Sequence, residues 1–157
     1  MLQAESSVRH PYATVNPWLF EPAIAPHIAA AHERLCAGAE VVLAEGAGGF
    51  LVPLDAERSC AELPGLLGME VLLVVGLRLG CLNHALLTAE AIVARGLAFS
   101  GWIGNCIDPD FPRRDANIAT LTARLPAPCL GIVPWMAKPA VGEAAAALSG
   151  APRLRAR

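Results

Sequence analysis

One short segment, Val41 to Gly49, constrains the fold of this chain more than any other. Its sequence is Val-Val-Leu-Ala-Glu-Gly-Ala-Gly-Gly, an apolar run that ends in a carboxylate and passes at once into a glycine-rich turn. A buried parallel strand delivers one acidic side chain to the carboxyl edge of its sheet in this way, and ligands of open α/β folds bind at that edge. The segment therefore predicts a strand over 41–45 within an α/β fold.

The turn that follows Glu45 predicts a site for a magnesium–nucleotide complex. Glycines at 46, 48 and 49 allow the backbone to approach an anionic ligand closely, because no Cβ stands in the way. The alternative is a tight strand-to-loop turn that merely leaves Glu45 exposed. Three glycines within four residues favour the binding site.

A second apolar run, Val71 to Gly76, predicts another core strand. A helix over about 83–95 follows it, so the residues from Gly80 to Asn83 lie where a loop becomes a helix N-terminus. Free N–H groups at such a position attract a carboxylate or a phosphate. Asn83 is also a natural N-cap, and capping its own helix is the simpler role.

The rest of the chain continues the alternation of strands and helices. Residues 1–22 contain three prolines and predict an irregular lead-in. The further elements that we expect are a helix over 25–37 that ends at Gly38, a broken helix over 56–67 stopped by Pro64 and Gly65, a strand over 100–105, a helix over 112–125, a strand over 129–133 and a helix over 140–148. This order predicts a single domain over 1–157 with a mainly parallel sheet and right-handed crossovers.

Composition excludes several classes of partner and compartment. The net charge of −2 argues against nucleic acid. No apolar run approaches the roughly 20 residues that a membrane span needs, and the first residues do not resemble a signal peptide. Five scattered cysteines, an odd number, predict reduced thiols in a cytoplasm, and neither they nor the four histidines have the spacing of a metal site. Hydrophobic residues nevertheless make up 55% of the chain, which favours an oligomer.

Four segments in order, VVLAEGAGGFLVPL, LLVVGLRLGCLNHALLTAEAI, GWIGNCIDP and APCLGIVPWM, resemble dethiobiotin synthetase, the ATP-dependent ligase of biotin biosynthesis. The resemblance runs from about Tyr12 to about Pro139. GLRLGCLNHALLT is its most specific part, because related nucleotide-binding families share the acid-and-glycine turn but not this sequence. The resemblance implies a three-layer P-loop NTPase-like fold, ATP and Mg²⁺ as cofactors, 7,8-diaminononanoate and CO₂ as substrates, a homodimer and a cytoplasmic location.

The resemblance also implies a role for individual residues. Glu45 is the magnesium ligand, and the ATP-binding residues are Glu45, Gly46, Ala47, Gly48, Asn105, Cys106, Pro134, Trp135 and Met136. The substrate carboxylate is held across the dimer interface by Gly80, Cys81, Leu82 and Asn83. Asn105 has an alternative role in an Asx-turn before Asp108, and Trp135 has one as a packing aromatic.

Two elements of the family pattern are missing from these 157 residues. The family has a strand and a P-loop with a Gly-Lys-Thr ending, and a further lysine contacts the substrate carbamate. Here no glycine is followed by Lys-Ser or Lys-Thr, and Lys138 is the only lysine. We therefore expect a truncated form that spans roughly the last two thirds of the pattern, lacks the catalytic lysines, has an open sheet edge and is inactive alone.

Two other interpretations remain open on the sequence. One is another ATPase or synthetase of the P-loop superfamily, which accounts for the Glu45 turn but not for GCLNHALLT. The other is a non-catalytic pseudoenzyme or dimerisation fragment.

Overall fold

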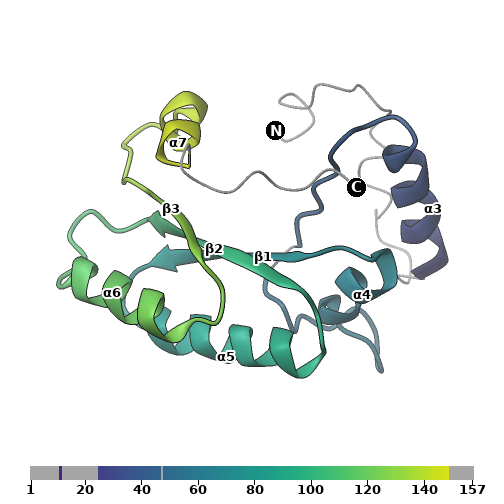
Figure 1. Cartoon of the computed structure of the whole chain (residues 1–157), viewed down its shortest axis with the longest axis horizontal. Coiled ribbons are helices and arrows are strands. Elements are labelled where there is room, and N and C mark those ends of the chain that lie inside the picture. Colours follow the sequence, from purple (N-terminus) through teal and green to yellow (C-terminus); the bar gives the residue numbers. More distant parts are fainter. Residues whose placement is uncertain (1–10, 12–24, 47, 149–157) are drawn as a thin grey trace. The chain divides into compact units, whose positions relative to one another are not determined.

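The structure, a computed structural model, describes residues 11, 25–46 and 48–148 (Figure 1). The chain divides into two compact units, each of which is described by itself. The N-terminal unit comprises Met1–Met69 with Arg155–Arg157, and the sheet unit comprises Glu70–Leu154. The expected single domain over 1–157 stays a prediction, and the expected lead-in over 1–22 lies outside the described residues apart from Pro11.

The sheet unit is built on three parallel strands in the order β1-β2-β3. They span Val71–Leu77 (β1), Phe99–Cys106 (β2) and Cys129–Val133 (β3). Short runs of apolar residues form these strands because a parallel strand needs apolar side chains on both faces. The α/β class with a parallel sheet and flanking helices is thus confirmed.

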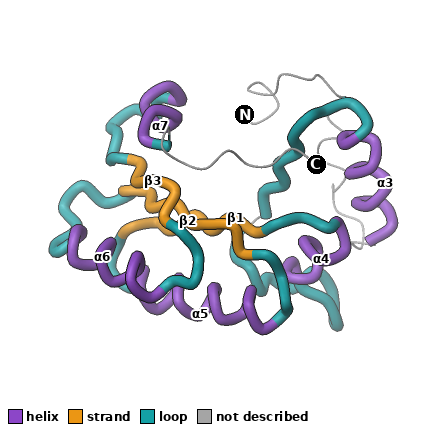
Figure 2. The backbone as a smooth tube through the Cα atoms, in the orientation of Figure 1, coloured by secondary structure: helices purple, strands orange, loops and turns teal. Residues whose placement is uncertain are grey.

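Helices lie on both sides of this sheet. Helices α5 (Cys81–Ala94) and α6 (Arg114–Arg124) pack on one face, and α7 (Val141–Ala147) lies on the other side next to β3 (Figures 1 and 2). The core between the sheet and α5 and α6 includes the fully buried side chains of Leu77, Trp102 and Leu121.

Close packing also joins α7 to the sheet. A Cβ on Gly131 of β3 would collide with the backbone carbonyl oxygen of Ala147 in α7. The approach of this helix to the strand therefore depends on a glycine.

The described part of the N-terminal unit contains helices and a long connection in which none of the described residues forms a strand. Helix α3 (Ala25–Cys36) ends within one residue of the expected boundary, two residues before Gly38. It contacts α4 (Leu63–Leu67), which directly follows the 3₁₀ turn η1 (Cys60–Glu62). The expected stop at Pro64 and Gly65 is wrong. Pro64 lies in the first turn of α4, where its missing N–H costs nothing, and Gly68 ends the helix at φ 62°.

The strand expected over 41–45 is also wrong. These residues have no regular secondary structure and pair with no strand among the described residues, and Val41 and Leu43 are 49% and 77% exposed. Apolar side chains alone do not make a strand, because the backbone N–H and C=O groups of a strand need a neighbour to pair with.

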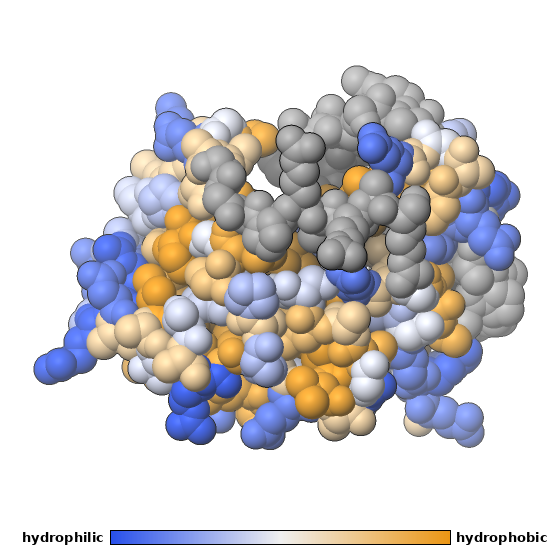
Figure 3. All heavy atoms as spheres, viewed as in Figure 1, coloured by the Kyte–Doolittle hydropathy of each residue, from blue (hydrophilic) through white to orange (hydrophobic). Residues whose placement is uncertain are grey.

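The surface of the described residues mixes polar and apolar groups. Figure 3 shows apolar residues reaching the visible surface between polar ones. Large apolar side chains that are about half exposed or more in the sheet unit are Val74, Leu79, Leu87, Val93, Ile107, Trp135 and Val141. No helix within the described ranges is both long and apolar enough to cross a bilayer.

Candidate functional site

The acidic turn predicted from the sequence is solvent-exposed and depends on glycine geometry. Glu45, Gly46 and Gly48 are all exposed, whereas Ala47 lies outside the described residues. Gly48 has φ +92°, a conformation that side chains disfavour, and a Cβ there would lie 2.9 Å from Cγ2 of Val52. The turn after Glu45 therefore needs glycine at position 48 for both reasons.

A short hairpin follows the turn. Pro53 and Ser59 form an antiparallel bridge, and the N–H of Cys60 donates to the carbonyl of Val52 at 2.8 Å. At its near end, the N–H of Val52 donates to the carbonyl of Gly49 at 3.3 Å. Val52 thus connects the hairpin to the glycine turn.

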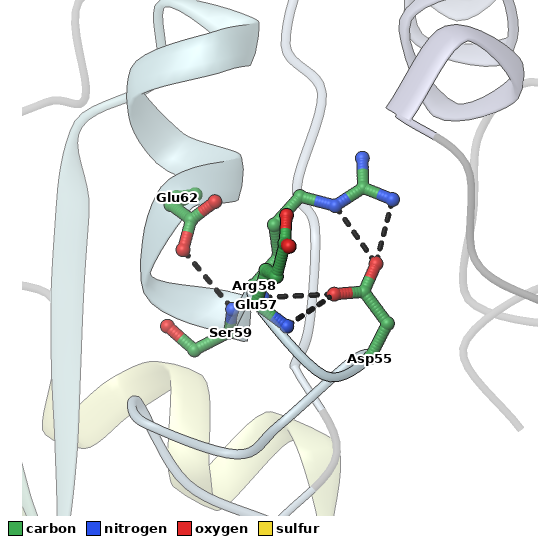
Figure 4. Close-up of polar contacts among 5 residues, drawn as sticks. All are labelled: Asp55, Glu57, Arg58, Ser59 and Glu62. Atoms are coloured by element: carbon green, nitrogen blue, oxygen red, sulfur yellow. Dashed lines mark hydrogen bonds and ion pairs between the residues drawn. The ribbon is translucent and has the colours of Figure 1, made fainter.

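The tip of this hairpin is closed by one carboxylate (Figure 4). Oδ1 of Asp55 accepts hydrogen bonds from the N–H groups of Glu57 at 2.9 Å and Arg58 at 2.8 Å. Its other oxygen, Oδ2, accepts from Nε of Arg58 at 2.8 Å and lies 2.6 Å from Nη2 of that guanidinium. These partners, led by the N–H of Glu57, stabilise the charged form and hold the pKa of Asp55 below its ordinary value.

In the sheet unit, the carboxyl ends of the three strands meet at one edge. Gly76 pairs with Asn105 and Asn105 with Val133 across the sheet. The loops that follow the three strands therefore begin side by side. Asn105, which is half-buried, is in the middle of this row.

The residues proposed for adenine differ in how much of each side chain is available. Trp135 is 45% exposed, Pro134 is exposed and Met136 is half-buried, so all three present surface just beyond β3. Cys106 is only 5% exposed and belongs to the core cluster between the sheet and its helices. A contact from Cys106 to a ligand would therefore come from its backbone.

The start of α5 differs from the expectation in one respect. Gly80, at φ 89°, is the N-cap residue and α5 begins at Cys81, so the expected N-cap role of Asn83 is wrong. Gly80, in the left-handed region, makes the turn three residues earlier than an N-cap at Asn83 would. Asn83 lies in the first turn and is exposed, and Leu82 is half-buried.

Some of the backbone N–H groups at the start of α5 already donate hydrogen bonds within the protein. The N–H of Cys81 donates to the carbonyl of Arg78 at 3.0 Å, and its buried thiol lies 4.0 Å from Oδ1 of Asn117 in α6. Nδ2 of Asn117 in turn donates to the carbonyl of Arg113 at 2.9 Å. The N–H groups of Leu82 and Asn83 have no partner within the helix, because they belong to its first turn, and they are the donors that an anion would meet.

Sequence reasoning assigned no role to a shallow hollow beyond β2. It measures about 340 Å³ and is lined by Pro109, Phe111, Arg113, Arg114, Asp115 and Ala116. Arg113 has φ 57°, and both arginines lie at the start of α6. The consecutive arginines were visible in the sequence, but the hollow and the unusual backbone were not.

The structure thus groups Gly80–Asn83, Asn105 and Pro134–Met136 at the carboxyl edge of the sheet unit. The Glu45 turn belongs to the N-terminal unit.

The described residues offer magnesium few protein ligands. No cluster of three or more His, Cys, Asp or Glu side chains is present among the described residues. Magnesium prefers oxygen ligands and is commonly held by one or two carboxylates together with substrate phosphates and water. An exposed Glu45 beside a glycine turn provides one such carboxylate.

Comparison with known proteins first defines the class. A family model described as an AAA domain matches residues 1–140. The chain therefore belongs to this family, and its parallel sheet with flanking helices is the P-loop NTPase-like type of α/β fold.

Individual relatives narrow the family further. The chain is 50% identical over 151 residues to the ATP-dependent dethiobiotin synthetase BioD of Pseudomonas paraeruginosa, covering 87% of this chain and 66% of that protein. It is 46% identical over 169 residues to the protein of the same name from Cellvibrio japonicus, covering 99% and 74%, and 44% identical over 167 residues to that of Ralstonia nicotianae, covering 98% and 73%. The chain belongs to the dethiobiotin synthetase family and spans about two thirds of the length of the first of these relatives.

Proposed function

We propose that this chain carries the magnesium, adenine and substrate-carboxylate elements of a dethiobiotin synthase, a cyclo-ligase of biotin biosynthesis. The observation that carries the proposal is the exposed Glu45 leading into a turn that only glycine fits at position 48. The relatives at 44–50% identity, all named ATP-dependent dethiobiotin synthetase, support ATP as the nucleotide.

In the reaction proposed, one amine of 7,8-diaminononanoate combines with CO₂ to form a carbamate. ATP phosphorylates the carbamate oxygen, and the second amine then attacks the carbamoyl carbon. The cyclic urea closes as phosphate leaves, so the products are dethiobiotin, ADP and phosphate. Positioning and charge stabilisation account for most of the catalysis of such a phosphoryl transfer.

We assign different residues of this chain to the metal, the phosphates and the adenine. Glu45 would hold magnesium, which neutralises charge on the phosphates when bound. Gly46, Ala47 and Gly48 would lie against the phosphates. The amide of Asn105, with Cys106 and the Pro134–Met136 segment, would contact the adenine.

The substrate carboxylate is assigned to the start of α5. Gly80, Cys81, Leu82 and Asn83 would receive it, with the unpaired N–H groups of the first turn as donors. In the arrangement we propose, the substrate belongs to the other subunit of a cytoplasmic homodimer. Exposed Leu79, at the entrance to this helix, is 89% accessible and is consistent with such an interface.

We further propose that a protein of these 157 residues has negligible activity by itself. Phosphoryl transfer relies on cationic groups around the transferred phosphate, and the sequence contains neither a Gly-Lys-Thr segment nor a lysine other than Lys138. The same observation favours one second candidate, a non-catalytic partner that forms mixed dimers with an intact synthetase.

Calorimetric titration with ATP, with and without magnesium, tests the nucleotide role. Glu45→Gln should weaken magnesium-dependent binding on the order of tenfold, or about 1.4 kcal/mol, and leave metal-free binding unchanged. Glu40→Gln is the matched control, because Glu40 is an exposed glutamate in the same connection. If magnesium strengthens ATP binding equally in the unsubstituted protein, Glu45→Gln and Glu40→Gln, then Glu45 is not part of the nucleotide site.

A further inference from the structure

The hairpin after the glycine turn is held by several hydrogen bonds and an ion pair, although it is partly exposed. Two hydrogen bonds join its sides near the tip, from the N–H groups of Leu54 at 2.8 Å and Asp55 at 3.3 Å to the carbonyl of Arg58. The Asp55 carboxylate adds four contacts of 2.6–2.9 Å across the same tip. Asp55 and Arg58 are both half-buried, with side chains 28% and 40% exposed.

The far side of the hairpin is held by a second carboxylate. Oε1 of Glu62 accepts a hydrogen bond from the N–H of Ser59 at 3.0 Å, and the N–H of Glu62 donates to the carbonyl of Ser59 at 3.2 Å (Figure 4). The hairpin thus ends in η1, which continues directly into α4. One side is therefore anchored to a helix, and the other side leads back to the glycine turn.

Val52 links the hairpin to the glycine turn through contacts with both. Its carbonyl accepts from Cys60 on the anchored side, its N–H donates to Gly49, and its Cγ2 lies against Gly48. Movement of the hairpin would therefore displace the turn that follows Glu45.

We propose that Asp55 is a positioning residue for Gly48 and Gly49, in the turn that follows Glu45. It closes the hairpin, the hairpin fixes Val52, and Val52 fixes the exit of the turn. The inference rests on the proposed function in one respect, since the turn it orders is the one assigned to the nucleotide phosphates. Asp55 itself touches neither nucleotide nor substrate in this account.

Both oxygens of the carboxylate are needed for this role. Oδ1 accepts from two backbone N–H groups and Oδ2 accepts from the guanidinium. An asparagine has one acceptor oxygen, so its NH₂ group would face either the backbone donors or the guanidinium. Asp55→Asn is therefore nearly isosteric but cannot close the tip in the same way.

Amide hydrogen exchange followed by NMR tests the inference. Asp55→Asn should raise the exchange rates of the Val52 and Cys60 amides on the order of tenfold and shift the resonances of Gly48 and Gly49, while the β1 and β2 amides keep their rates. Glu57→Gln is the matched control, because Glu57 is an exposed acidic residue of the same tip and contributes its backbone N–H to the hydrogen bond. Unchanged Val52 exchange and unchanged glycine resonances in Asp55→Asn would overturn the inference.

A binding readout separates positioning from general stability. Asp55→Asn should weaken magnesium-dependent ATP binding on the order of tenfold when binding is measured well below the melting temperature of the variant, where the protein is still folded. Binding equal to that of the unsubstituted protein would also overturn the inference. If the unsubstituted protein binds no nucleotide, the proposed function fails, and the exchange measurement still decides whether Asp55 orders the turn.

A second variant covers the case in which Asp55→Asn unfolds its unit. Arg58→Lys keeps the charge opposite Asp55 but removes the Nε and Nη2 pair that contacts Oδ2. It should produce a smaller rise in Val52 exchange of the same kind. No rise in a folded Arg58→Lys protein would contradict the proposed chain of contacts.

Discussion

The two units of this chain are built from similar sequence material with different results. In the sheet unit, Val71–Leu77 forms the strand β1 and pairs along its length with β2. In the N-terminal unit, the comparably apolar segment 41–44 forms no regular secondary structure and pairs with no strand among the described residues. The difference lies in the neighbours and not in the propensity of the residues.

Continuous strand–helix–strand units explain the order of the sheet unit. β1, α5 and β2 follow one another, as do β2, α6 and β3, so each strand finds its partner one crossover away. Val41–Ala44 has no such neighbouring unit before it among the described residues. A strand pattern thus predicts a strand only where the chain also supplies a partner.

Removal of a buried aromatic side chain should give the largest contrast between the units. Trp102, in β2, is fully buried, and Trp102→Ala should destabilise the sheet unit by about 3–5 kcal/mol, because a large cavity forms in its core. Leu43→Ala, at a side chain 77% exposed, should change stability by less than about 0.5 kcal/mol. Urea unfolding followed by circular dichroism measures both. Comparable losses would mean that the Leu43 segment is packed as the sheet is.

A smaller effect is expected where α7 meets β3. Gly131→Ala places a methyl group against the carbonyl oxygen of Ala147 and should cost about 1–3 kcal/mol through displacement of the helix. Gly142→Ala, within α7 and with open space around its Cβ, should be neutral or stabilising by up to about 1 kcal/mol. Thermal unfolding of the two variants decides the point. The opposite order would show that α7 is not held against Gly131.

The Asp55 hairpin should make the N-terminal unit sensitive to acid. The pKa of this carboxyl is lowered in the folded protein, so its contribution to stability is present above the ordinary value of about 3.9 and is lost as the pH falls through the lower folded value. The unsubstituted protein should therefore be more stable than Asp55→Asn at neutral pH, and the difference should shrink in acid. A difference that grows as the pH falls would contradict the assignment of the charged form to the hairpin.

The smallest expected difference between the two units is in the reactivity of their cysteine thiols. Burial raises the pKa of Cys60, whereas Cys36 is exposed at the end of α3 with its Sγ 3.4 Å from Nε2 of His32. Iodoacetamide at mildly alkaline pH should label Cys36 first and Cys60 later, with the buried Cys81 and Cys106 of the sheet unit last. Peptide mapping by mass spectrometry follows the order. Faster labelling of Cys81 than of Cys36 would show that the start of α5 is open.

Much of the sheet unit could be predicted from the sequence. The run Cys129–Val133 forms the expected strand without a change of boundary, and β1 and β2 differ from expectation by one residue at most at each end. Helix starts were harder, because they depend on backbone angles that single residues adopt. Gly80 and Arg113, both in the left-handed region, set the starts of α5 and α6.

The candidate site also has parts that the sequence indicates and parts that it does not. The acidic glycine turn and the residues at the strand ends could be selected as candidates from the sequence, since their residue types suit metal, phosphate and base contacts, and their roles stay predictions. The Asp55 hairpin was missed, although Ser59 followed by Glu62 three residues later is a recognisable capping pattern. Its importance depends on Val52, whose contacts with Gly48 and Gly49 no local pattern predicts.

The most direct test of the central claim is dethiobiotin formation by a protein of these 157 residues, supplied with ATP, magnesium, bicarbonate and 7,8-diaminononanoate. The Pseudomonas paraeruginosa synthetase, whose name gives that activity, is the positive control. We expect magnesium-dependent ATP binding without measurable dethiobiotin, because the proposed binding residues lie within this sequence and the lysines of the P-loop and of the carbamate contact do not. Product formation at a rate near that of the control would contradict the account.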